Sequence, residues 1–210
     1  MNLKNIIFDL GGVVLNINYQ LTEIAFSKIG LHNFSELYSQ SKQNFLFDGF
    51  EKGIISPNEF RKELKSFFNH PISEEEIDFA WNSMLLDLPK ERVDLLLELK
   101  KKYRTFLLSN SNAIHYDVYT KNLQKDYQIN SLGDLFEKDY FSFRLHMRKP
   151  DEEIFLHVLN DAGIIPAETL FIDDSIQHIE TAKKLGIIVY LLEKKESILD
   201  LFENGKYIYQ

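Results

Sequence analysis

Several residues that could bind a metal ion or a phosphate lie at or near the ends of short apolar runs in this sequence. They are Asp9, Ser109, Asn110, Lys149, Asp173 and Asp174. Carboxylates suit Mg²⁺, and an aspartate beside such an ion can attack phosphorus and form an aspartyl phosphate. Hydroxyl, amide and ammonium groups can bind and neutralise phosphoryl oxygens. If the fold gathers these side chains, they would support phosphoryl transfer assisted by a divalent cation.

The apolar runs themselves are typical of strands buried in a parallel sheet, because they are continuous rather than alternating. The five expected strands cover residues 6–8, 105–108, 140–143, 169–172 and 187–192. Helical patterns are expected at 89–102, 151–162 and 175–185. The alternation predicts an α/β fold whose parallel sheet is flanked by helices. In such folds ligands bind beyond the carboxyl ends of the strands, where the polar residues lie.

Residues 15–88 have a different pattern, which predicts an all-helical insertion after the first strand. They contain no good strand, and two capping boxes, Ser56–Glu59 and Ser73–Glu76, each mark the start of a helix. The residues expected to face inward from these two helices are Phe60, Leu64, Phe67, Ile77, Trp81, Met84 and Leu85. Further helices are expected around 21–29 and within 35–47. The predicted domains are an α/β core of residues 1–14 and 89–210 and a helical domain of residues 15–88.

Composition excludes several classes of function. The 210 residues carry 24 basic and 32 acidic side chains, a formal net charge of −8, which argues against general nucleic-acid binding. The absence of cysteine excludes disulfide scaffolds, thiolate zinc sites and cysteine nucleophiles. No apolar run is long enough to cross a membrane, and Asp9 interrupts the apolar N-terminal stretch, so no signal peptide is expected. We expect a cytoplasmic protein that binds a small molecule; its oligomeric state is not predicted.

Four motifs carry a resemblance to a known family. They are Phe8–Val13, Leu107–Asn110, Arg148–Pro150 and Phe171–Asp174. In this order they resemble the four motifs of the haloacid dehalogenase (HAD) superfamily, whose core is a Rossmann-like α/β fold. The helical insertion resembles the small helical cap of that superfamily, and the likeness covers essentially the whole chain. The amino-acid sequences of the first motif and of Leu108–His115 most resemble those of bacterial sugar-phosphate phosphatases, including phosphatases that act on α-D-glucose 1-phosphate.

This resemblance implies a set of metal ligands and a nucleophile. Asp9 would attack phosphorus and bind Mg²⁺, and the backbone carbonyl of Gly11 would be a second ligand. Asp174 would bind the metal directly, with Asp173 orienting it or a metal-bound water. The run from Asp174 to Ile179 supports that order, since it places His178 where the family often has a further acidic residue.

The resemblance also implies how phosphate would be held. Ser109, the backbone amide of Asn110 and Gly12 would bind the phosphoryl oxygens, and Lys149 would neutralise both Asp9 and the phosphate. Three phenylalanines of the insertion, Phe45, Phe47 and Phe50, are expected to form the surface that faces the substrate.

One position departs from the family pattern. The usual phosphatase has an aspartate two residues after the nucleophile, which protonates the leaving group and then activates water, but this chain has Gly11 there. General acid–base groups contribute about 10²–10⁴-fold to rates. We therefore expect slow turnover or a leaving group that needs little protonation, as in anomeric sugar, acyl or aryl phosphates. His115, His146 and Tyr19 are candidate substitutes.

Two other functions remain open at this point. A metal-independent 2-haloacid dehalogenase would use the same aspartate to displace halide, but it has no use for the late acidic pair Asp173-Asp174. A weakly active, phosphorylatable or ligand-binding module would follow if an aspartyl phosphate formed on Asp9 and Gly11 could not promote its hydrolysis. The leading prediction is a Mg²⁺-dependent phosphatase acting on a small phosphorylated metabolite, such as a sugar phosphate.

Overall fold

The computed structural model describes residues 2–39, 42–43 and 45–209. The elements of the α/β part are β1 (Asn5–Phe8), α6 (Lys90–Leu99), β4 (Arg104–Ser109), α7 (Ala113–Tyr127), β5 (Lys138–Phe141), α8 (Ser142–Leu145), α9 (Glu152–Ala162), β6 (Thr169–Asp173), α10 (Ile176–Lys184) and β7 (Ile188–Leu191). Three short 3₁₀ turns, η1 (Leu132–Leu135), η2 (Pro166–Glu168) and η3 (Ile198–Leu201), and the hairpin β8 (Phe202–Glu203) and β9 (Lys206–Tyr207) complete it. Between β1 and α6 lie α1 (Tyr19–Lys28), α2 (Phe34–Leu37), β2 (Tyr38–Ser39), β3 (Lys42–Gln43), α3 (Phe45–Glu51), α4 (Pro57–Lys65) and α5 (Glu74–Asn82).

A five-stranded parallel sheet in the order β5-β4-β1-β6-β7 forms the centre of the α/β part, as the apolar runs predict. β1 pairs with β4 on one side and with β6 on the other, and in both pairs its register runs from Asn5 to Phe8. Along the chain, β4 and β5 are thus added on one side of β1, and β6 and β7 are then added on the other side. The polar residues after β1 lie at this switch in strand order, where open α/β sheets bind ligands.

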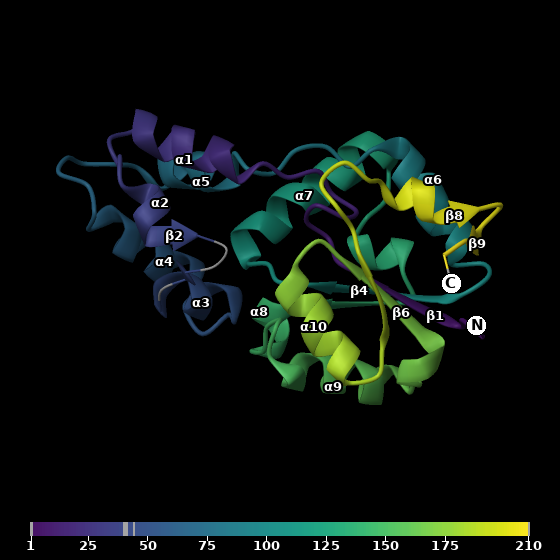
Figure 1. Cartoon of the computed structure of the whole chain (residues 1–210). Helices are drawn as coiled ribbons and strands as arrows, with labels where there is room; N and C mark the ends of the chain where they lie inside the picture. The colour runs from purple at the N-terminus through teal and green to yellow at the C-terminus, as the bar shows by residue number, and fades with distance from the viewer. Residues whose placement is uncertain (1, 40–41, 44, 210) are drawn as a thin grey trace.

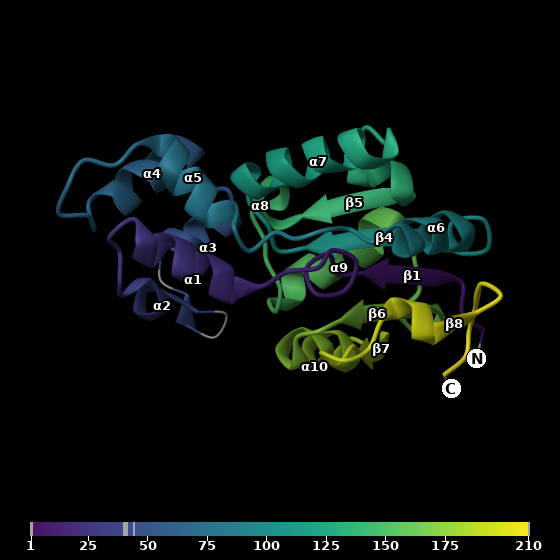
Figure 2. The ribbon, with the colours of Figure 1, turned by 90° about the horizontal axis from the view of Figure 1, so that it is seen from above.

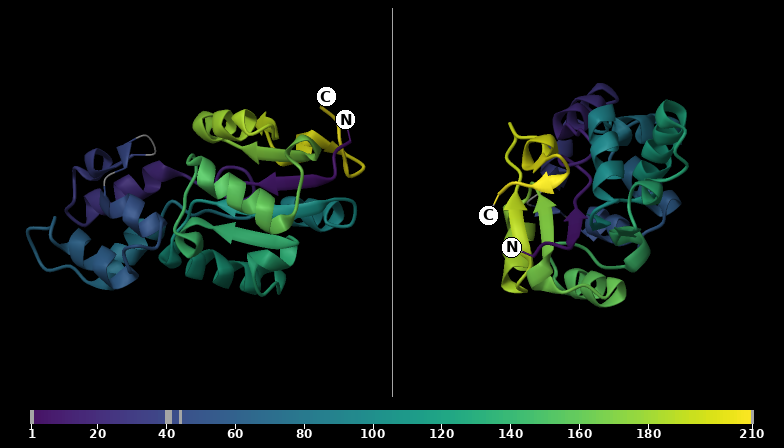
Figure 3. Two further views of the ribbon diagram at one scale, coloured as in Figure 1. Left: turned by 90° about the horizontal axis from the view of Figure 1, so that it is seen from below. Right: turned by 90° about the vertical axis from the view of Figure 1, so that its right-hand side faces the viewer.

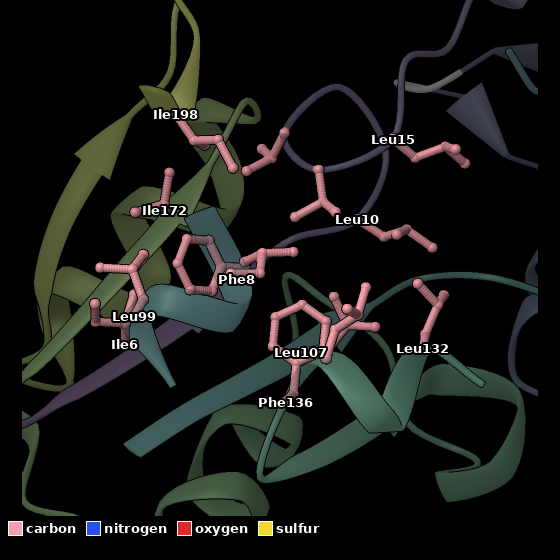
Figure 4. Close-up of a cluster of buried hydrophobic side chains, with 14 of the residues drawn as sticks. Ile6, Phe8, Leu10, Leu15, Leu99, Leu107, Leu132, Phe136, Ile172 and Ile198 are labelled. Carbon is pink, nitrogen blue, oxygen red and sulfur yellow. The ribbon is translucent and has the colours of Figure 1, made fainter. Parts of the chain in front are cut away.

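Alternate residues of each strand enter different apolar cores, one on each face of the sheet. Ile6 and Phe8 pack with α6, α7 and η3 in one core, whereas Ile7 packs with α9 and α10 in the other. Figure 4 shows Phe8 between Ile172 of β6 and Leu107 of β4 in the first core. This double coverage explains why the strands read as continuous apolar runs, and it fixes the ends of β1, β4 and β6 against one another.

Helices α1 to α5 surround a third apolar cluster, separate from the two cores of the sheet. Both predicted capping boxes are present at the starts of α4 and α5, where Ser56 and Ser73 accept from the backbone three residues on. These helices lie beyond the end of the sheet toward which the strand arrows point (Figure 2). They therefore stand over the carboxyl ends of the strands, where the candidate site residues are.

The structure corrects some expectations for the helical segment. Phe67 is 41 % exposed because α4 ends at Lys65, and Phe68 is buried instead. Helices are present at both ends of residues 35–47, as α2 and α3, but the short hairpin of β2 and β3 lies between them; residues 40, 41 and 44 lie outside the described part. Phe47 and Phe50 are only 1 % and 2 % exposed within the cluster, so the expectation that they face the substrate is wrong, and only Phe45 is exposed.

The α/β part also differs in detail from the prediction. The third strand ends at Phe141, because Ser142–Leu145 turn into the short helix α8. The fifteen-residue helix α7 has no counterpart in the predicted set. The two ends of the chain lie near each other at the side of the sheet opposite to α1–α5 (Figures 1 and 3). Within the described residues, no helix has the length and apolar character that a bilayer span requires.

Candidate active site

The turn after β1 presents Asp9 at the carboxyl end of the central strand. The Asp9 amide donates to the carbonyl of Ile172 in β6 at 2.9 Å, which continues the sheet by one residue. The chain then reverses, with the amides of Val14 and Leu15 both donating to the carbonyl of Leu10. Gly12 has φ +79°, a backbone conformation that favours glycine. A Cβ there would lie 2.3 Å from Oδ2 of Asp174, so Gly12 also leaves room for that carboxylate.

Lys149 binds two of the carboxylates at once. Its Nζ lies 2.6 Å from Oδ1 of Asp9 and 2.7 Å from Oδ2 of Asp173, and the side chain has no exposed surface. The two negative charges outweigh burial and raise the pKa of Lys149. Burial raises the pKa of the Asp9 carboxyl, an effect that Lys149 opposes only in part. A permanently charged ammonium therefore lies directly beside the predicted nucleophile.

Asp173 is held by donors on all sides. Besides Lys149, it accepts from the Ser175 amide at 2.8 Å and from Nδ1 of His178 at 2.9 Å. Because a carboxylate can only accept, Nδ1 of His178 carries the proton. Burial alone would raise the pKa of Asp173, but Lys149 and His178 outweigh it and lower the pKa. Asp173 has little capacity left for a metal and is suited to positioning Lys149.

Asp174, in contrast, has its carboxylate directed toward the cavity and close to the other two acids. Ligand oxygens of Asp9, Asp173 and Asp174 all lie within 4.8 Å of one another. Burial, reinforced by Asp9 and Asp173, raises the pKa of Asp174 to about 7. Three carboxylates this close repel one another, and a divalent cation would relieve that repulsion. The donor set of carboxylates around a glycine-lined turn fits Mg²⁺.

Asn110 and Lys149 join the loops after β4 and β5. The Asn110 side chain donates to the Lys149 carbonyl at 2.8 Å and accepts from the Lys149 amide at 2.9 Å. This reciprocal pair fixes the backbone of Lys149, a role for the Asn110 side chain that the sequence did not indicate. Ser109 is 2 % exposed and lines a smaller neighbouring cavity rather than the one that contains Asp9. The Gly12 amide already donates to the Leu15 carbonyl at 2.9 Å within the turn.

A cavity of about 290 Å³ lies over Asp9. Its lining from the α/β part includes Asp9, Gly11, Asn110, Arg148, Lys149, Asp174 and His178. Its lining from the helical segment consists of Tyr19, Tyr38, Asp48 and Glu51. Of these four, sequence analysis had singled out Tyr19 alone. Polar residues of α3 thus line the cavity over Asp9, in place of the phenylalanines that the sequence predicts there.

The three candidate substitutes for an acid at position 11 lie in different surroundings. His115 stacks on Trp81 outside the Asp9 cavity, and burial lowers its pKa to about 3. His146 is tied by Nδ1 to the carbonyl of Lys52. Tyr19 lines the Asp9 cavity with 39 % of its surface exposed, and desolvation within the cavity, followed by Tyr38, Asp174 and Asp9, raises the pKa of its hydroxyl above the ordinary value of 10. Of the three, Tyr19 is the one that lines the cavity containing Asp9.

Comparison with known proteins identifies the family. The family model described as hydrolase, haloacid dehalogenase-like hydrolase, matches residues 3–186. The chain belongs to the HAD-like hydrolases. This HAD-like hydrolase is 34 % identical over 184 residues to a D-ribitol-5-phosphate phosphatase from Bacteroides thetaiotaomicron, covering 88 % of this chain and 89 % of that protein.

Solved structures agree with this assignment. A HAD family enzyme from Bacteroides thetaiotaomicron, crystallised as a single-site mutant with magnesium and inorganic phosphate, matches the HAD-like hydrolase with a TM-score of 0.91 and 40 % identity. The match covers 96 % of this chain and 99 % of that one. A predicted HAD-like family hydrolase from Porphyromonas gingivalis matches with a TM-score of 0.87 and 32 % identity, over 95 % and 96 % of the two chains. The HAD-like core expected from the four motifs is therefore confirmed.

Proposed function

We propose that this HAD-like hydrolase is a Mg²⁺-dependent phosphatase that acts on a small phosphorylated sugar or sugar alcohol through an aspartyl phosphate on Asp9. The observation that carries the proposal is that Asp9, Lys149 and Asp174 lie close together although they come from three segments, which follow β1, α8 and β6. The similarity to a D-ribitol-5-phosphate phosphatase supports the substrate class. The relative crystallised with magnesium and phosphate supports the cofactor.

Each residue of the site has a distinct role in the proposed reaction. Asp9 attacks phosphorus, the bond between phosphorus and the leaving oxygen breaks, and water later cleaves the aspartyl phosphate to release inorganic phosphate. Lys149 holds Asp9 by Oδ1 and offsets charge on the phosphoryl oxygens, while Asp173 holds Lys149. The motif order assigns Ser109, the Asn110 amide and Gly12 to the phosphoryl oxygens, and of these three Asn110 alone lines the Asp9 cavity. Mg²⁺, held by Asp9, Asp174 and the Gly11 carbonyl, with Asp173 behind them, would supply positive charge against those oxygens.

Protonation of the leaving group is assigned to Tyr19. Gly11 has no side chain to donate a proton, whereas Tyr19 lines the same cavity and keeps its hydroxyl proton at neutral pH. A tyrosine of raised pKa is a weak acid, so its main contribution is a hydrogen bond to the departing oxygen. This agrees with the slow turnover, or the undemanding leaving group, expected from Gly11.

Residues 15–88 would act as a cap domain on a core formed by residues 1–14 and 89–210. Their apolar cluster is distinct from the cores of the sheet, and the segment supplies Tyr19, Tyr38, Asp48 and Glu51 to the cavity. A domain that closes over a phosphate site excludes water and selects the remainder of the substrate. Substrate selection is therefore assigned to the cap and phosphate binding to the core.

The two other functions are less well supported. A metal-independent dehalogenase would leave Asp174 close to Asp9 and Asp173 with no cation to offset the repulsion. A phosphorylatable switch would need the aspartyl phosphate to persist, which predicts a stable phosphoenzyme without phosphate release.

The proposal is tested by measuring inorganic phosphate released from sugar phosphates, sugar-alcohol phosphates and p-nitrophenyl phosphate. We expect release with Mg²⁺, loss of release with EDTA, and a fall of at least about 10³-fold in Asp9→Asn. Asp126→Asn, a charge change on the outer end of α7, is the matched control and should leave the rate unchanged. Absence of release from every phosphomonoester would contradict the proposal.

A further inference from the structure

Arg148 links the core to the cap at the wall of the Asp9 cavity. It directly precedes Lys149, and its guanidinium lies 2.5 Å from Oδ1 of Asp48 and 3.1 Å from Oε2 of Glu51, both in α3. The Arg148 side chain is 16 % exposed and the Glu51 side chain 11 %, so the ion pair between these two residues is largely desolvated. All three residues line the cavity. The part of the cavity wall that α3 contributes therefore consists of two carboxylates that share one cation.

The charges of this wall limit what the cavity can accept besides the phosphoryl group. Among the residues that the structure describes, four carboxylates and two permanently charged cations line it, and both cations are already paired with carboxylates. Within this described lining, a second anionic group on the substrate would meet Asp48 and Glu51, while both permanently charged cations are already paired. Like charges brought together in this way are a strong means of excluding the wrong ligand.

Hydroxyl groups fit the same wall. A carboxylate offers about four acceptor sites, and Arg148 uses only part of those on Asp48, which is 41 % exposed toward solvent. A cavity of about 290 Å³ lies just below the usual range of small-molecule sites, roughly 300–1,000 Å³. A short polyhydroxylated chain suits both the size and the acceptors, and a nucleotide does not.

From this arrangement we infer that Asp48 and Glu51, fixed by Arg148, select phosphomonoesters whose remainder is an uncharged polyol and reject those carrying a second anionic group. This rests on the phosphatase function proposed above. Asp48 is the residue best suited to a test, because its carboxylate is the more exposed of the two and Asn preserves its shape.

The experiment compares D-ribitol 5-phosphate with D-ribonate 5-phosphate, which has a carboxylate in place of the terminal CH₂OH. We expect kcat/KM of the unmodified enzyme to be at least about tenfold higher on the ribitol ester, a difference of 1.4 kcal/mol. In Asp48→Asn, Arg148 keeps its ion pair with Glu51 but loses the one with Asp48, so it can also pair with the substrate carboxylate. The ratio should therefore fall at least threefold, mainly through a lower KM for the ribonate ester.

Asp151→Asn is the matched control. Asp151 pairs with Lys52 at 3.2 Å across the same boundary between cap and core, but it does not line the cavity. The control should keep the substrate ratio of the unmodified enzyme. The dissociation constants of both esters, measured by calorimetry on Asp9→Asn protein with Mg²⁺, give the same comparison without turnover.

The outcomes separate this inference from the function on which it rests. Equal kcat/KM and equal affinity for the two esters would overturn the inference, as would an unchanged ratio in Asp48→Asn or the same change in Asp151→Asn. Mg²⁺-dependent hydrolysis of p-nitrophenyl phosphate with no preference for the ribitol ester would leave the phosphatase function standing and the inference refuted. Failure to hydrolyse any phosphomonoester would instead refute the proposed function.

Discussion

Lys149 neutralises two buried carboxylates, and its removal tests that role directly. In Lys149→Met, Asp9 and Asp173 would lose their shared cation while remaining buried. Breaking a buried ion pair in this way costs about 3–5 kcal/mol. We expect that loss in the free energy of unfolding measured with urea at pH 7, together with loss of phosphatase activity.

The pH dependence of this variant gives a further check. Lys149 helps to keep the pKa of Asp173 low, so in its absence the carboxylates take up protons more easily and part of the lost stability should return between pH 7 and 5. Lys138→Met is the control, since Lys138 makes an exposed pair with Asp161 that is worth about 0–1 kcal/mol. Equal destabilisation of the two variants would show that Lys149 is not neutralising buried charge.

As the proposed ligand of Mg²⁺, Asp174 would make binding of the ion depend on pH. Its pKa of about 7 means that below pH 7 a proton occupies the carboxylate that the metal needs. We expect the dissociation constant for Mg²⁺ to rise by close to tenfold per pH unit below 7, with uptake of metal releasing about one proton. Calorimetry at pH 6 and 8, in buffers of different ionisation enthalpy, measures both. Pure pH independence would contradict the assignment of Asp174 as a ligand.

The same carboxyl sets the sign of the stability change in metal-free protein. Its folded pKa lies above the ordinary value of 3.8, so the folded state holds a proton that the unfolded state has released. Its contribution to stability is complete below about pH 4 and is lost as the pH rises through about 7. Asp174→Asn should remove this part of the slope from urea-unfolding curves measured with EDTA.

At the scale of elements, Gly12 in the turn after β1 combines a positive φ with a close approach to Asp174. A comparison with Gly163, which has only the positive φ, separates these two effects. Gly12 has φ +79° and Gly163, the end of α9, has φ +61°, so alanine strains both by about 1–2 kcal/mol. At Gly12 the added Cβ also meets Asp174, whereas at Gly163 nothing lies within 4 Å. We expect similar loss of stability in both variants but weaker Mg²⁺ binding, by tenfold or more, in Gly12→Ala alone.

An aspartate at position 11, which the family pattern has, would need a second substitution at Ile17 to make room for it. A Cβ at Gly11 would lie 3.1 Å from Cδ1 of Ile17, which Ile17→Val removes. Gly11→Asp with Ile17→Val should therefore raise kcat on sugar phosphates toward the 10²–10⁴-fold that an acid–base group supplies. Hydrolysis of p-nitrophenyl phosphate, whose leaving group needs little protonation, should change much less. No gain on either substrate would contradict the assigned role of position 11.

The strands and motif residues could be predicted because their signals are local. A continuous apolar run followed by Asp9 or Asp173 predicts both a buried strand and the end of that strand at which polar side chains gather. Helix α7 was missed because its buried residues, which include His115 and Tyr119, do not form a simple apolar stripe. The link from Arg148 to Asp48 joins residues 100 positions apart, and no local pattern encodes that pairing.

At the scale of the whole molecule, the chain has separate apolar interiors for the sheet and for α1–α5. Phe47 belongs to the second and is 1 % exposed, while Phe45, two residues earlier, is 80 % exposed. Phe47→Ala should cost about 3–5 kcal/mol and Phe45→Ala less than about 0.5 kcal/mol. Urea unfolding followed by the fluorescence of Trp81, which contacts Phe47, measures both changes at the cluster concerned. Equal costs would contradict the assignment of Phe47 to this buried cluster.

Both chain ends lie at the side of the sheet away from α1–α5, and the Asp9 cavity is lined by residues of α1–α5 and of the loops that face them. A tag, a fluorescent protein or a linker to a solid support can therefore be joined to either end without standing in the path of incoming molecules. If both ends were attached to a support, the sheet would be immobilised, whereas α1–α5 would have no attachment of their own. This makes the enzyme suited to single-molecule recordings in which a dye on the helical segment reports its movement relative to an immobilised base.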